Sequence, residues 1–319
     1  MSRTVPSGVA PADLARLDAL AAERGIELQR NVPLAHLTTL RVGGSADRFA
    51  DARTNDQLLA MLRAAHESRV PAFVLGNGSD LVVADAGMRG LVVRNRARAV
   101  TISDDLLTAD AGSAMAMLVK RCTSQALTGL EFGISIPGTL GGAVWANAGA
   151  HGGEMRDVVE WVQAWDPDAD GVRRLTADDC AFAYRESRFK HSTEVVLAAA
   201  LRVRGGDAQK VAALVAEHHA QRVATQPLAD QNAGSVFRNP PGDHAGRLID
   251  AAGLKGRRVG SAMVSPLHAN FIVTDRGGRA ADVRQLGEQV RTSVHEAFGV
   301  ELAYELEFVG EWDAPEKRS

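Results

Sequence analysis

The chain has 319 residues, of which 45% are hydrophobic and 24% are charged, ordinary globular values that argue against a disordered protein and against a membrane protein. This length exceeds what one compact core usually supports, so we expect two or three domains. A net charge of -3 offers no general attraction for phosphate backbones, so we expect no nucleic-acid partner. Any anionic ligand must then be held by local arginines and backbone amides.

The first third of the chain alternates helical patterns with short apolar runs. Apolar residues at helical spacing predict a helix over 11–24 that ends near a glycine. Thr54 and Gln57 have the spacing of a capping box, which predicts a second helix over 54–69. Residues 71–93 alternate short apolar runs with glycine turns and therefore predict successive strands.

The rest of the chain continues as α+β. Ser113 is expected to cap a third helix, and the apolar residues within 158–204 alternate or form groups that are typical of strands. A helix is predicted over 208–223, and we place a domain boundary close to it. Beyond this boundary FIV at 271–273 predicts a strand before a long amphipathic helix, and residues 301–310 predict a closing strand. The pattern contains no internal repeat.

The cellular compartment is predicted from what the sequence lacks. Only Cys122 and Cys180 are present, which favours a reducing compartment, although one disulfide bridge between them stays open. The first 25 residues have no signal-peptide stretch, and the apolar run at 195–201 is too short to span a bilayer. We therefore expect a cytoplasmic protein with no membrane partner, and we expect no metal because no His/Cys set has ligand spacing.

Two glycine-rich loops are candidate ligand sites. In GNGSD at 76–80, two glycines between apolar runs let backbone N–H groups converge on an anion. A strand follows, so the Rossmann dinucleotide fingerprint does not apply. In IPGTLGGAVWANAG at 136–149, glycines permit close backbone approach, while Thr139 and Asn147 offer hydrogen-bond partners. Together the loops fit a large diphosphate-bearing ligand, and two structural turns are the alternative.

Four polar side chains stand out in strongly patterned surroundings. Arg185 follows the strand-like FAY and suits a carboxylate or an enolate, with a plain surface arginine as the alternative. Ser235, in a glycine turn without the G-x-S-x-G of a nucleophile, is a candidate proton donor or a structural serine. Glu305 among apolar residues is a candidate acid, an orienting anion or a salt-bridged edge residue. His268 is a ligand contact or a structural histidine.

Seven segments, in order from about residue 30 to 312, resemble the UDP-N-acetylenolpyruvoylglucosamine reductases. They are TTLRVGGSAD at 38–47, VLGNGSDLVV at 74–83, IPGTLGGAVWANAGAHG at 136–152, YRESRFK at 184–190, AGSVFRNP at 233–240, AAGLKGRRVGSAMVSPLHANFIV at 251–273 and FGVELAYELEFVG at 298–310. The ordered set is far more specific than any one motif.

This resemblance implies a flavoenzyme of bacterial cell-wall precursor synthesis. Its fold would be α+β, with an FAD-binding fold of the vanillyl-alcohol-oxidase and p-cresol-methylhydroxylase type in two subdomains and a C-terminal substrate domain. The expected units are a lead-in at 1–30, subdomains at 31–95 and 96–207, and a substrate domain at 208–319. We expect a monomer.

The resemblance also implies the cofactor residues. Both loops would hold FAD, the first at its pyrophosphate, and the attachment would be noncovalent because Asn77 lies where covalent relatives often carry a histidine. The residues expected at FAD are Gly76, Asn77, Gly78, Ser79, Asp80, Gly138, Thr139, Gly141, Gly142, Ala143 and Asn147.

In the implied mechanism NADPH reduces the flavin and leaves, and UDP-N-acetylglucosamine enolpyruvate then enters the same cleft. Hydride passes from N5 of reduced FAD to the methylene carbon, Arg185 and Glu305 stabilise the enolate, and Ser235 protonates the adjacent carbon. The residues expected to bind substrate are Tyr184, Arg238, Asn239 and His268.

The sequence departs from the family pattern in three respects. Asp80 stands where asparagine is usual, and Thr274 also replaces a common asparagine. The only tyrosines, Tyr184 and Tyr304, lie inside other motifs, so we expect the compact subtype that lacks a tyrosine lid. A sugar-oxidising flavoprotein of the same fold and a noncatalytic nucleotide-sugar or flavin-binding module remain the alternatives.

Overall fold

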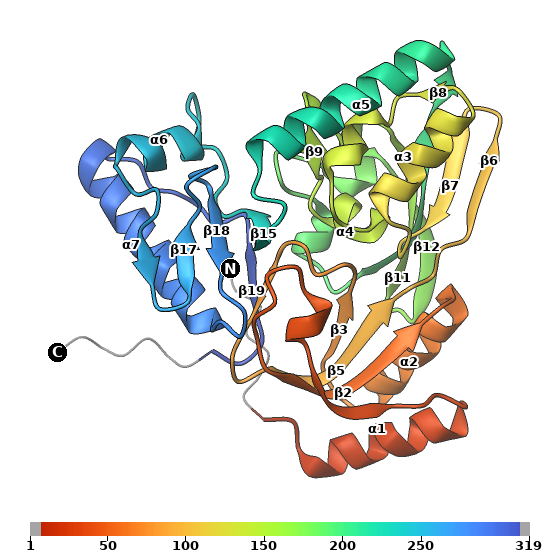
Figure 1. Cartoon of the computed structure of the whole chain (residues 1–319). Helices are drawn as coiled ribbons and strands as arrows, with labels where there is room; N and C mark the ends of the chain where they lie inside the picture. Colours follow the sequence, from red (N-terminus) through yellow and green to blue (C-terminus); the bar gives the residue numbers. More distant parts are fainter. Residues whose placement is uncertain (1–7, 313–319) are drawn as a thin grey trace.

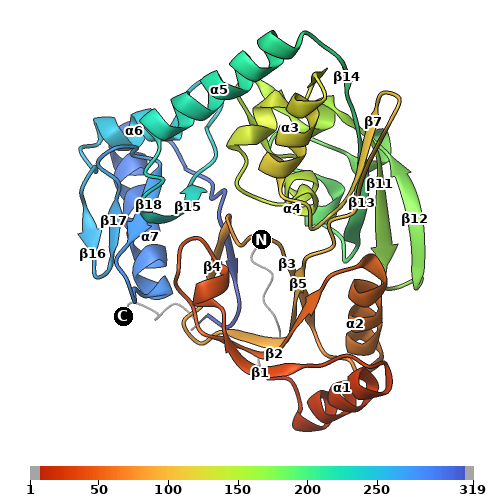
Figure 2. The same ribbon diagram turned by 45° about the vertical axis from the view of Figure 1, so that its right-hand side comes forward.

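The computed structural model describes residues 8–312, which form three α+β units (Figure 1, Figure 2). Residues of all three units line one large cavity. The first two units follow one another in the chain, and the third contains most of the sequence beyond residue 226. Within residues 8–312 no helix combines the length and the apolar character needed to cross a membrane.

The first unit is a four-stranded sheet with two helices packed on one face (Figure 1). The strand order is β1-β2-β5-β3, with β1 antiparallel to β2 and with β2 and β3 parallel to β5. Its elements are α1 (Pro11–Glu23), β1 (Gln29–Pro33), β2 (Ser45–Ala52), α2 (Asn55–Glu67), β3 (Ala72–Leu75) and β5 (Met88–Asn95). The predicted cap is confirmed, because the Thr54 hydroxyl accepts a hydrogen bond from the Gln57 amide at 3.2 Å.

The second unit is a five-stranded antiparallel sheet of order β12-β11-β13-β7-β6, whose apolar core is shared with α3 and α4. Strand β13 is central and almost wholly buried, which explains the apolar run that the sequence places there. The larger elements are β6 (Val100–Ser103), β7 (Leu106–Asp110), α3 (Met115–Ser124), α4 (Leu140–Trp145), β11 (Val159–Asp166), β12 (Gly171–Thr176) and β13 (Val195–Arg202). The short elements used below are β8 (Leu127–Thr128), η2 (Glu131–Ser135), β9 (Gly149–Ala150), β10 (Gly153–Glu154) and η5 (Arg188–Lys190).

Two expectations about this unit need correction. Ser113 does not cap α3: the cap position is Ala114, and the buried Ser113 hydroxyl has no partner within the described part of the chain. The backbone of Ser113 instead bonds to Asp110 and Leu140, which holds the residue in the turn before the helix. Helix α5 (Ala208–Thr225), expected in the third domain, packs on η2, α3 and β8 and so belongs by contact to the second unit.

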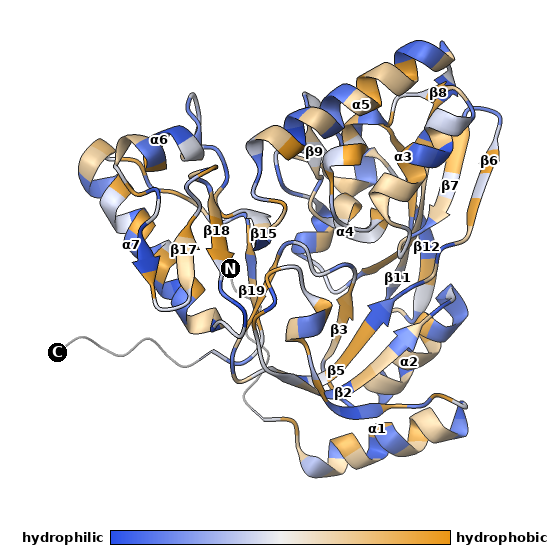
Figure 3. Cartoon of the chain, in the orientation of Figure 1, coloured by the Kyte–Doolittle hydropathy of each residue, from blue (hydrophilic) through white to orange (hydrophobic). Residues whose placement is uncertain are grey.

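The third unit is a four-stranded antiparallel sheet of order β15-β18-β17-β16, which shares an apolar core with α6 and α7. Its elements are β15 (Gln231–Ser235), α6 (Ala245–Ala251), β16 (Arg258–Val259), β17 (Ala262–Val264), β18 (Phe271–Thr274) and α7 (Ala280–Phe298). Hydropathy colouring shows β18 as strongly hydrophobic, whereas α5 alternates polar and apolar turns (Figure 3).

The end of the chain returns to the first unit. Strand β19 (Glu307–Val309) pairs in parallel with β4 (Leu81–Val83), the strand that follows the first glycine loop. The predicted closing strand over 301–310 is therefore shorter than expected, because residues before Glu307 make an isolated bridge, Tyr304 to Phe237, with the third unit. This return places Glu305 beside the cavity.

Candidate active site

A cavity of about 1160 Å³ lies where the three units meet. Drug-sized ligands fill roughly 300 to 1,000 Å³, so this space can hold a dinucleotide or a cofactor together with part of a second ligand. The glycine loops of the first two units line it, and so do residues of β15 and the segment before β19 in the third.

The first glycine loop connects β3 to β4 and touches the second loop directly. Gly78 has φ +61, and a Cβ there would come within 2.5 Å of the Leu37 carbonyl oxygen. A Cβ on Gly76 would come within 2.6 Å of the Thr139 hydroxyl oxygen. The Asn77 amide donates to the Pro137 carbonyl at 2.9 Å. Only glycine therefore permits this contact between two loops that are about sixty residues apart in the sequence.

The second loop forms the adjacent wall. Thr139 is the cap residue of α4, and a Cβ on Gly141 would press on that of Ala111 at 2.9 Å. A Cβ on Gly142 would make only an ordinary contact, 3.8 Å from the Thr139 hydroxyl oxygen, and a Cβ on Gly138 would lie 3.4 Å from the Ser79 hydroxyl oxygen. The wall thus combines tight backbone contacts behind the loop with bare backbone facing the cavity. Ala143 lines the cavity floor and belongs to the buried core.

Asn147 is placed differently from the expectation. Its side chain is fully buried and lies outside the cavity lining. The amide nitrogen donates to Glu154 at 2.7 Å and to the Ala183 carbonyl at 2.8 Å, and the amide oxygen accepts from the Arg156 backbone at 2.9 Å. All of these partners belong to the protein, so the residue is a structural tie between the second loop and the turn that carries Arg185.

Arg185 is held in a tight turn at φ +56, a conformation that nonglycine residues rarely adopt. Its Nε donates to Glu305 Oε1 at 2.7 Å, and Nη2 donates to the Gly149 carbonyl at 3.0 Å. The two charged side chains retain 20% and 21% of their exposure, which places them at the cavity surface. The turn thus aims a positively charged group into the cavity and a glutamate fixes it there.

Ser235 ends β15 opposite Phe271, directly after Gly234 at φ +81. Its hydroxyl makes no hydrogen bond within residues 8–312 and lines the main cavity together with Arg185 and Glu305. The backbone explains this proximity, because the Val236 carbonyl accepts from the Glu305 amide at 2.9 Å. Three residues that are distant in sequence therefore share one wall, and the serine proton is available to a ligand.

The residues expected at substrate divide into two groups. Asn239 and His268 line a smaller cavity of about 380 Å³ that shares Ser235 with the main one. His268 Nδ1 accepts from the Asn270 amide, and burial lowers the pKa of this histidine. Tyr184 and Arg238 lie outside the linings of both cavities: the Tyr184 hydroxyl accepts from the Asn239 amide, and Arg238 is paired with Glu186 at 2.6 Å.

Several residues at the site were not singled out from the sequence. Lys190 Nζ is 3.1 Å from Glu307 Oε1 and lies 4.3 Å from the centre of the Trp145 ring, with only 6% of its side chain exposed. Glu307 lies two residues beyond Glu305, so period-two spacing along the segment was a signal for it. Nothing in the local sequence indicated that Lys190 faces it.

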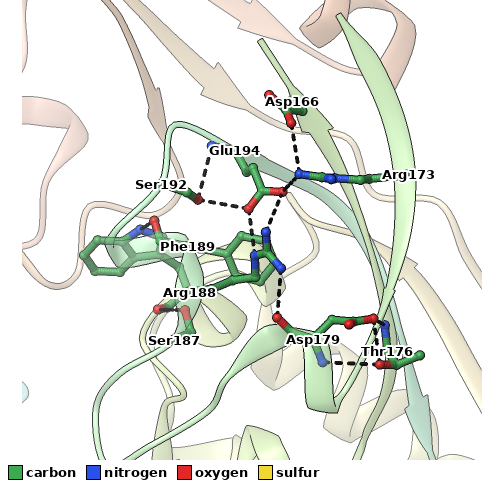
Figure 4. Close-up of polar contacts among 10 residues, drawn as sticks. Asp166, Arg173, Thr176, Asp179, Ser187, Arg188, Phe189, Ser192 and Glu194 are labelled. Carbon is green, nitrogen blue, oxygen red and sulfur yellow. Dashed lines mark hydrogen bonds and ion pairs between the residues drawn. The ribbon is translucent and has the colours of Figure 1, made fainter. Parts of the chain in front are cut away.

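A charged cluster at the cavity wall surrounds Glu194, which itself lines the cavity (Figure 4). Glu194, 4% exposed, accepts hydrogen bonds from Arg173 at 2.7 Å, Arg188 at 2.8 Å and Ser192 at 3.0 Å. Arg188 begins η5 and Lys190 ends it, so the buried carboxylate sets the position of this short helix. Pairing of this kind is what a buried carboxylate requires.

Helix α5 covers another side of the cavity. Gln221, Arg222 and Thr225 line the cavity from its last turns. His151 also lines it and stacks on His218 of α5, with parallel rings 3.9 Å apart. Burial, and then the neighbouring His218, lower the pKa of His151. Amphipathic spacing predicted the helix but not which residues face the cavity.

Two further sequence predictions concern the cysteines and metal binding. Both cysteines are free and buried, and burial raises the pKa of Cys122 to about 11 and that of Cys180 to about 12, so the disulfide left open by the sequence is absent. Within residues 8–312 no three His, Cys, Asp or Glu side chains gather in a way that could hold a metal ion.

Comparison with known proteins gives consistent matches over most of the chain. An FAD binding domain model matches residues 46–174, and the model for the C-terminal domain of UDP-N-acetylenolpyruvoylglucosamine reductase matches residues 226–309. The chain is 42% identical over 299 residues to UDP-N-acetylenolpyruvoylglucosamine reductase 2 of Symbiobacterium thermophilum, covering 92% of this chain and 96% of the relative. It is 38% identical to the reductase of Lactiplantibacillus plantarum, covering 92% and 97%.

A solved structure agrees with these sequence matches. UDP-N-acetylenolpyruvylglucosamine reductase from Thermus caldophilus superposes with a TM-score of 0.76 at 33% identity, covering 88% of this chain and 98% of that one. The predicted α+β architecture, with an FAD-binding fold followed by a C-terminal domain, is thereby confirmed.

Proposed function

Because the chain belongs to the UDP-N-acetylenolpyruvoylglucosamine reductase family of oxidoreductases, we propose that it uses NADPH and noncovalently bound FAD to reduce UDP-N-acetylglucosamine enolpyruvate to UDP-N-acetylmuramate in peptidoglycan precursor synthesis. The observation that carries the proposal is the meeting of Arg185, Ser235 and Glu305 on one wall of a cavity whose adjoining wall is built from two glycine loops.

The cavity walls fit FAD. Gly142 presents no side chain to the cavity, although its N–H is bonded to the Thr139 hydroxyl, and the tight turn at Gly78 brings the backbone of the first loop to the cavity wall, where a bulky anionic cofactor needs close approach. The fit extends over Gly76 to Asp80 and over Gly138 to Ala143, and it leaves out Asn147, whose side chain is already used. When bound, FAD supplies hydride transfer between the nicotinamide and the enolpyruvyl carbon.

The three polar residues then have separate tasks. Arg185 presents a fixed cation to the substrate carboxylate and to the negative charge that develops beside it during reduction. Glu305 orients Arg185 through their 2.7 Å contact. Ser235, whose hydroxyl has no acceptor within residues 8–312, gives its proton to the carbon next to the reduced one and recovers a proton from water.

The smaller cavity next to Ser235 supports binding of the rest of the substrate. Asn239 and His268 line it together with Arg247, which is paired with Asp243, and Lys255, which is 2.7 Å from Asp250. A substrate diphosphate would bind there by taking the place of these carboxylate partners. Tyr184 and Arg238 support this wall from behind through Asn239 and Glu186. Tyr304 is half-buried and its hydroxyl donates to Glu288, and neither Tyr304 nor Tyr184 lines a cavity, which supports the compact subtype without a tyrosine lid.

The test separates the two half-reactions under anaerobic conditions. NADPH reduces the flavin first, the UDP-enolpyruvyl sugar is added, and flavin reoxidation is followed by absorbance. For Ser235→Ala we expect unchanged flavin reduction and reoxidation slowed by about 10² to 10⁴, the range for loss of a general acid. Ser124→Ala, on the exposed end of α3, is the control. Reoxidation of Ser235→Ala at the wild-type rate would remove this serine from the mechanism.

Two further assays test the alternatives. In air-saturated buffer, oxygen consumption with a free sugar would favour a sugar-oxidising flavoprotein. A yellow protein that reacts with neither NADPH nor the UDP-enolpyruvyl sugar would favour a noncatalytic binding module. Replacing NADPH with NADH in the first step measures the nicotinamide preference.

A further inference from the structure

Asp80 lies in an unusual concentration of charge at the base of the first glycine loop. It lines the cavity with Arg185, Glu305 and Glu307, and Lys190 lies behind them. The Asp80 carbonyl accepts the Glu307 amide at 3.1 Å, so Asp80 lies directly beside the segment that carries both glutamates.

The two cations of this cluster are already paired. Arg185 contacts Glu305 at 2.7 Å, and Lys190 contacts Glu307 at 3.1 Å. The Asp80 carboxyl has no cation in contact and accepts no hydrogen bond within residues 8–312. Ionisation of Asp80 would therefore place a third negative charge in a cluster with two positive ones, and an uncompensated charge at a cavity wall is costly.

The local electrostatics act in the same direction. The Asp80 side chain is half-buried, because part of its surface faces the cavity and the rest packs against protein. Burial raises the pKa of Asp80 well above its usual range, and the charges of Glu305 and Glu307 add to this rise. Lys190 and Arg185 oppose it without cancelling it, since each is already neutralised by a glutamate.

Resting on the proposed function, we propose that Asp80 carries a proton at neutral pH and acts as a neutral hydrogen-bond donor to an acceptor atom of the flavin cofactor. A protonated carboxyl has one O–H donor, whereas a carboxylate has none. In its ionised form the same residue would repel an anionic cofactor. Asp80 is thus a positioning residue whose proton is part of the cofactor site.

This role predicts a specific pH dependence of cofactor affinity. Proton binding and FAD binding are linked, so affinity is constant while Asp80 stays protonated and falls as pH rises through the pKa of the free protein. With one proton involved, the Kd for FAD rises by about tenfold per pH unit beyond that point. Asp80→Asn has nearly the same shape, keeps a donor and cannot ionise.

The experiment titrates apoprotein with FAD by fluorescence from pH 6 to 10 in the wild type, in Asp80→Asn and in the surface control Asp56→Asn. We expect Asp80→Asn to match the wild-type Kd within about tenfold at pH 7 and to lose the alkaline rise in Kd, which Asp56→Asn retains. Superimposable wild-type and Asp80→Asn profiles, or an affinity loss beyond about tenfold at pH 7, would overturn the inference.

A second measurement does not depend on how the variant folds. The infrared spectrum of wild-type holoprotein at pH 7, compared in water and in heavy water, is expected to contain the carbonyl stretch of a buried protonated carboxyl, and its absence contradicts the inference. The outcome is also separable from the proposed function. If wild-type protein binds no FAD at any pH, both fail, whereas binding with the pH profile of Asp80→Asn removes only the role of Asp80.

Discussion

Replacement of Gly78 by alanine tests whether the first glycine loop is shaped by close backbone contact. Gly78 has φ +61, and a Cβ there would lie 2.5 Å from the Leu37 carbonyl oxygen and 2.8 Å from the Thr38 Cα. Both neighbours are backbone atoms, so they cannot rotate away as a side chain would. The Gly78 carbonyl also accepts the Thr39 amide at 3.0 Å, and any shift of the loop stretches this bond.

The structure provides a control for the conformational part of the cost. Gly253 has φ +71 with nothing within 4 Å of its would-be Cβ, so its alanine variant carries only the left-handed penalty of about 1 to 2 kcal/mol. Gly78→Ala adds the displacement of packed backbone, comparable to overpacking at about 1 to 3 kcal/mol. We therefore expect a total loss of about 2 to 5 kcal/mol of unfolding free energy.

Urea unfolding of both variants, with and without FAD, measures this difference. Gly78→Ala is expected to lose more stability than Gly253→Ala. It is also expected to bind FAD more weakly by at least about tenfold, because the free-energy cost of the backbone displacement, roughly 1 kcal/mol or more, falls on the proposed cofactor loop itself. Gly253→Ala is expected to keep the wild-type Kd for FAD. Equal losses of stability in the two variants, together with unchanged FAD affinity, would refute the role assigned to the loop.

Two further outcomes follow from the geometry. The pKa of His151 is lowered in the folded protein by burial and by the stacked His218, so the unfolded chain binds more protons than the folded one at acidic pH. The free energy of unfolding of the wild type, relative to His151→Phe, is therefore expected to be constant above the unfolded pKa of about 6.5 and to fall as pH decreases below it. Urea unfolding at pH 8 and pH 5 measures this difference. A wild-type decrease no larger than that of His151→Phe would contradict this. Asn147→Ala leaves the Ala183 carbonyl and the Arg156 N–H without their partner, while Glu154 keeps its ion pair with Arg156, and is expected to cost about 2 to 4 kcal/mol of stability. Asn77→Ala, at an exposed loop, should cost about 1 kcal/mol, and the reverse order would show that Asn147 is not the structural tie.

Local patterns predicted the fold elements well because their causes are local. The helical spacing over 11–24 and the Thr54 cap each depend on neighbours within one or two turns, and both helices form where they were expected. Ser113 failed for the opposite reason, since its conformation is set by bonds to Asp110 and Leu140 rather than by the helix that follows. The assignment of α5 to a domain likewise depends on contacts with η2 and α3, which its amphipathic pattern does not name.

The sequence motifs selected three residues that the structure brings to one cavity, and they missed contacts whose partners come from elsewhere. Arg185, Ser235 and Glu305 were selected from three separate motifs, and the family resemblance joined them. Asn147 belongs to a true glycine loop, yet its side chain turns inward to Glu154, a direction that loop composition does not reveal. The pairing of Lys190 with Glu307 joins residues more than a hundred positions apart, so no local pattern could indicate it.

The β4–β19 pair explains why the cofactor loop and the acidic wall act together. Asp80 immediately precedes β4, and its carbonyl accepts the amide of Glu307 at the start of β19. Glu305 is two residues before that point and is tied to Val236, next to Ser235. The parallel pair therefore ties the first glycine loop to the segment that carries Glu305 and, through Val236, to Ser235. On the proposed function, a change that displaces β19 is expected to weaken FAD binding and to move the proposed proton donor at the same time, because the binding energy of the cofactor is available only when this pair is intact.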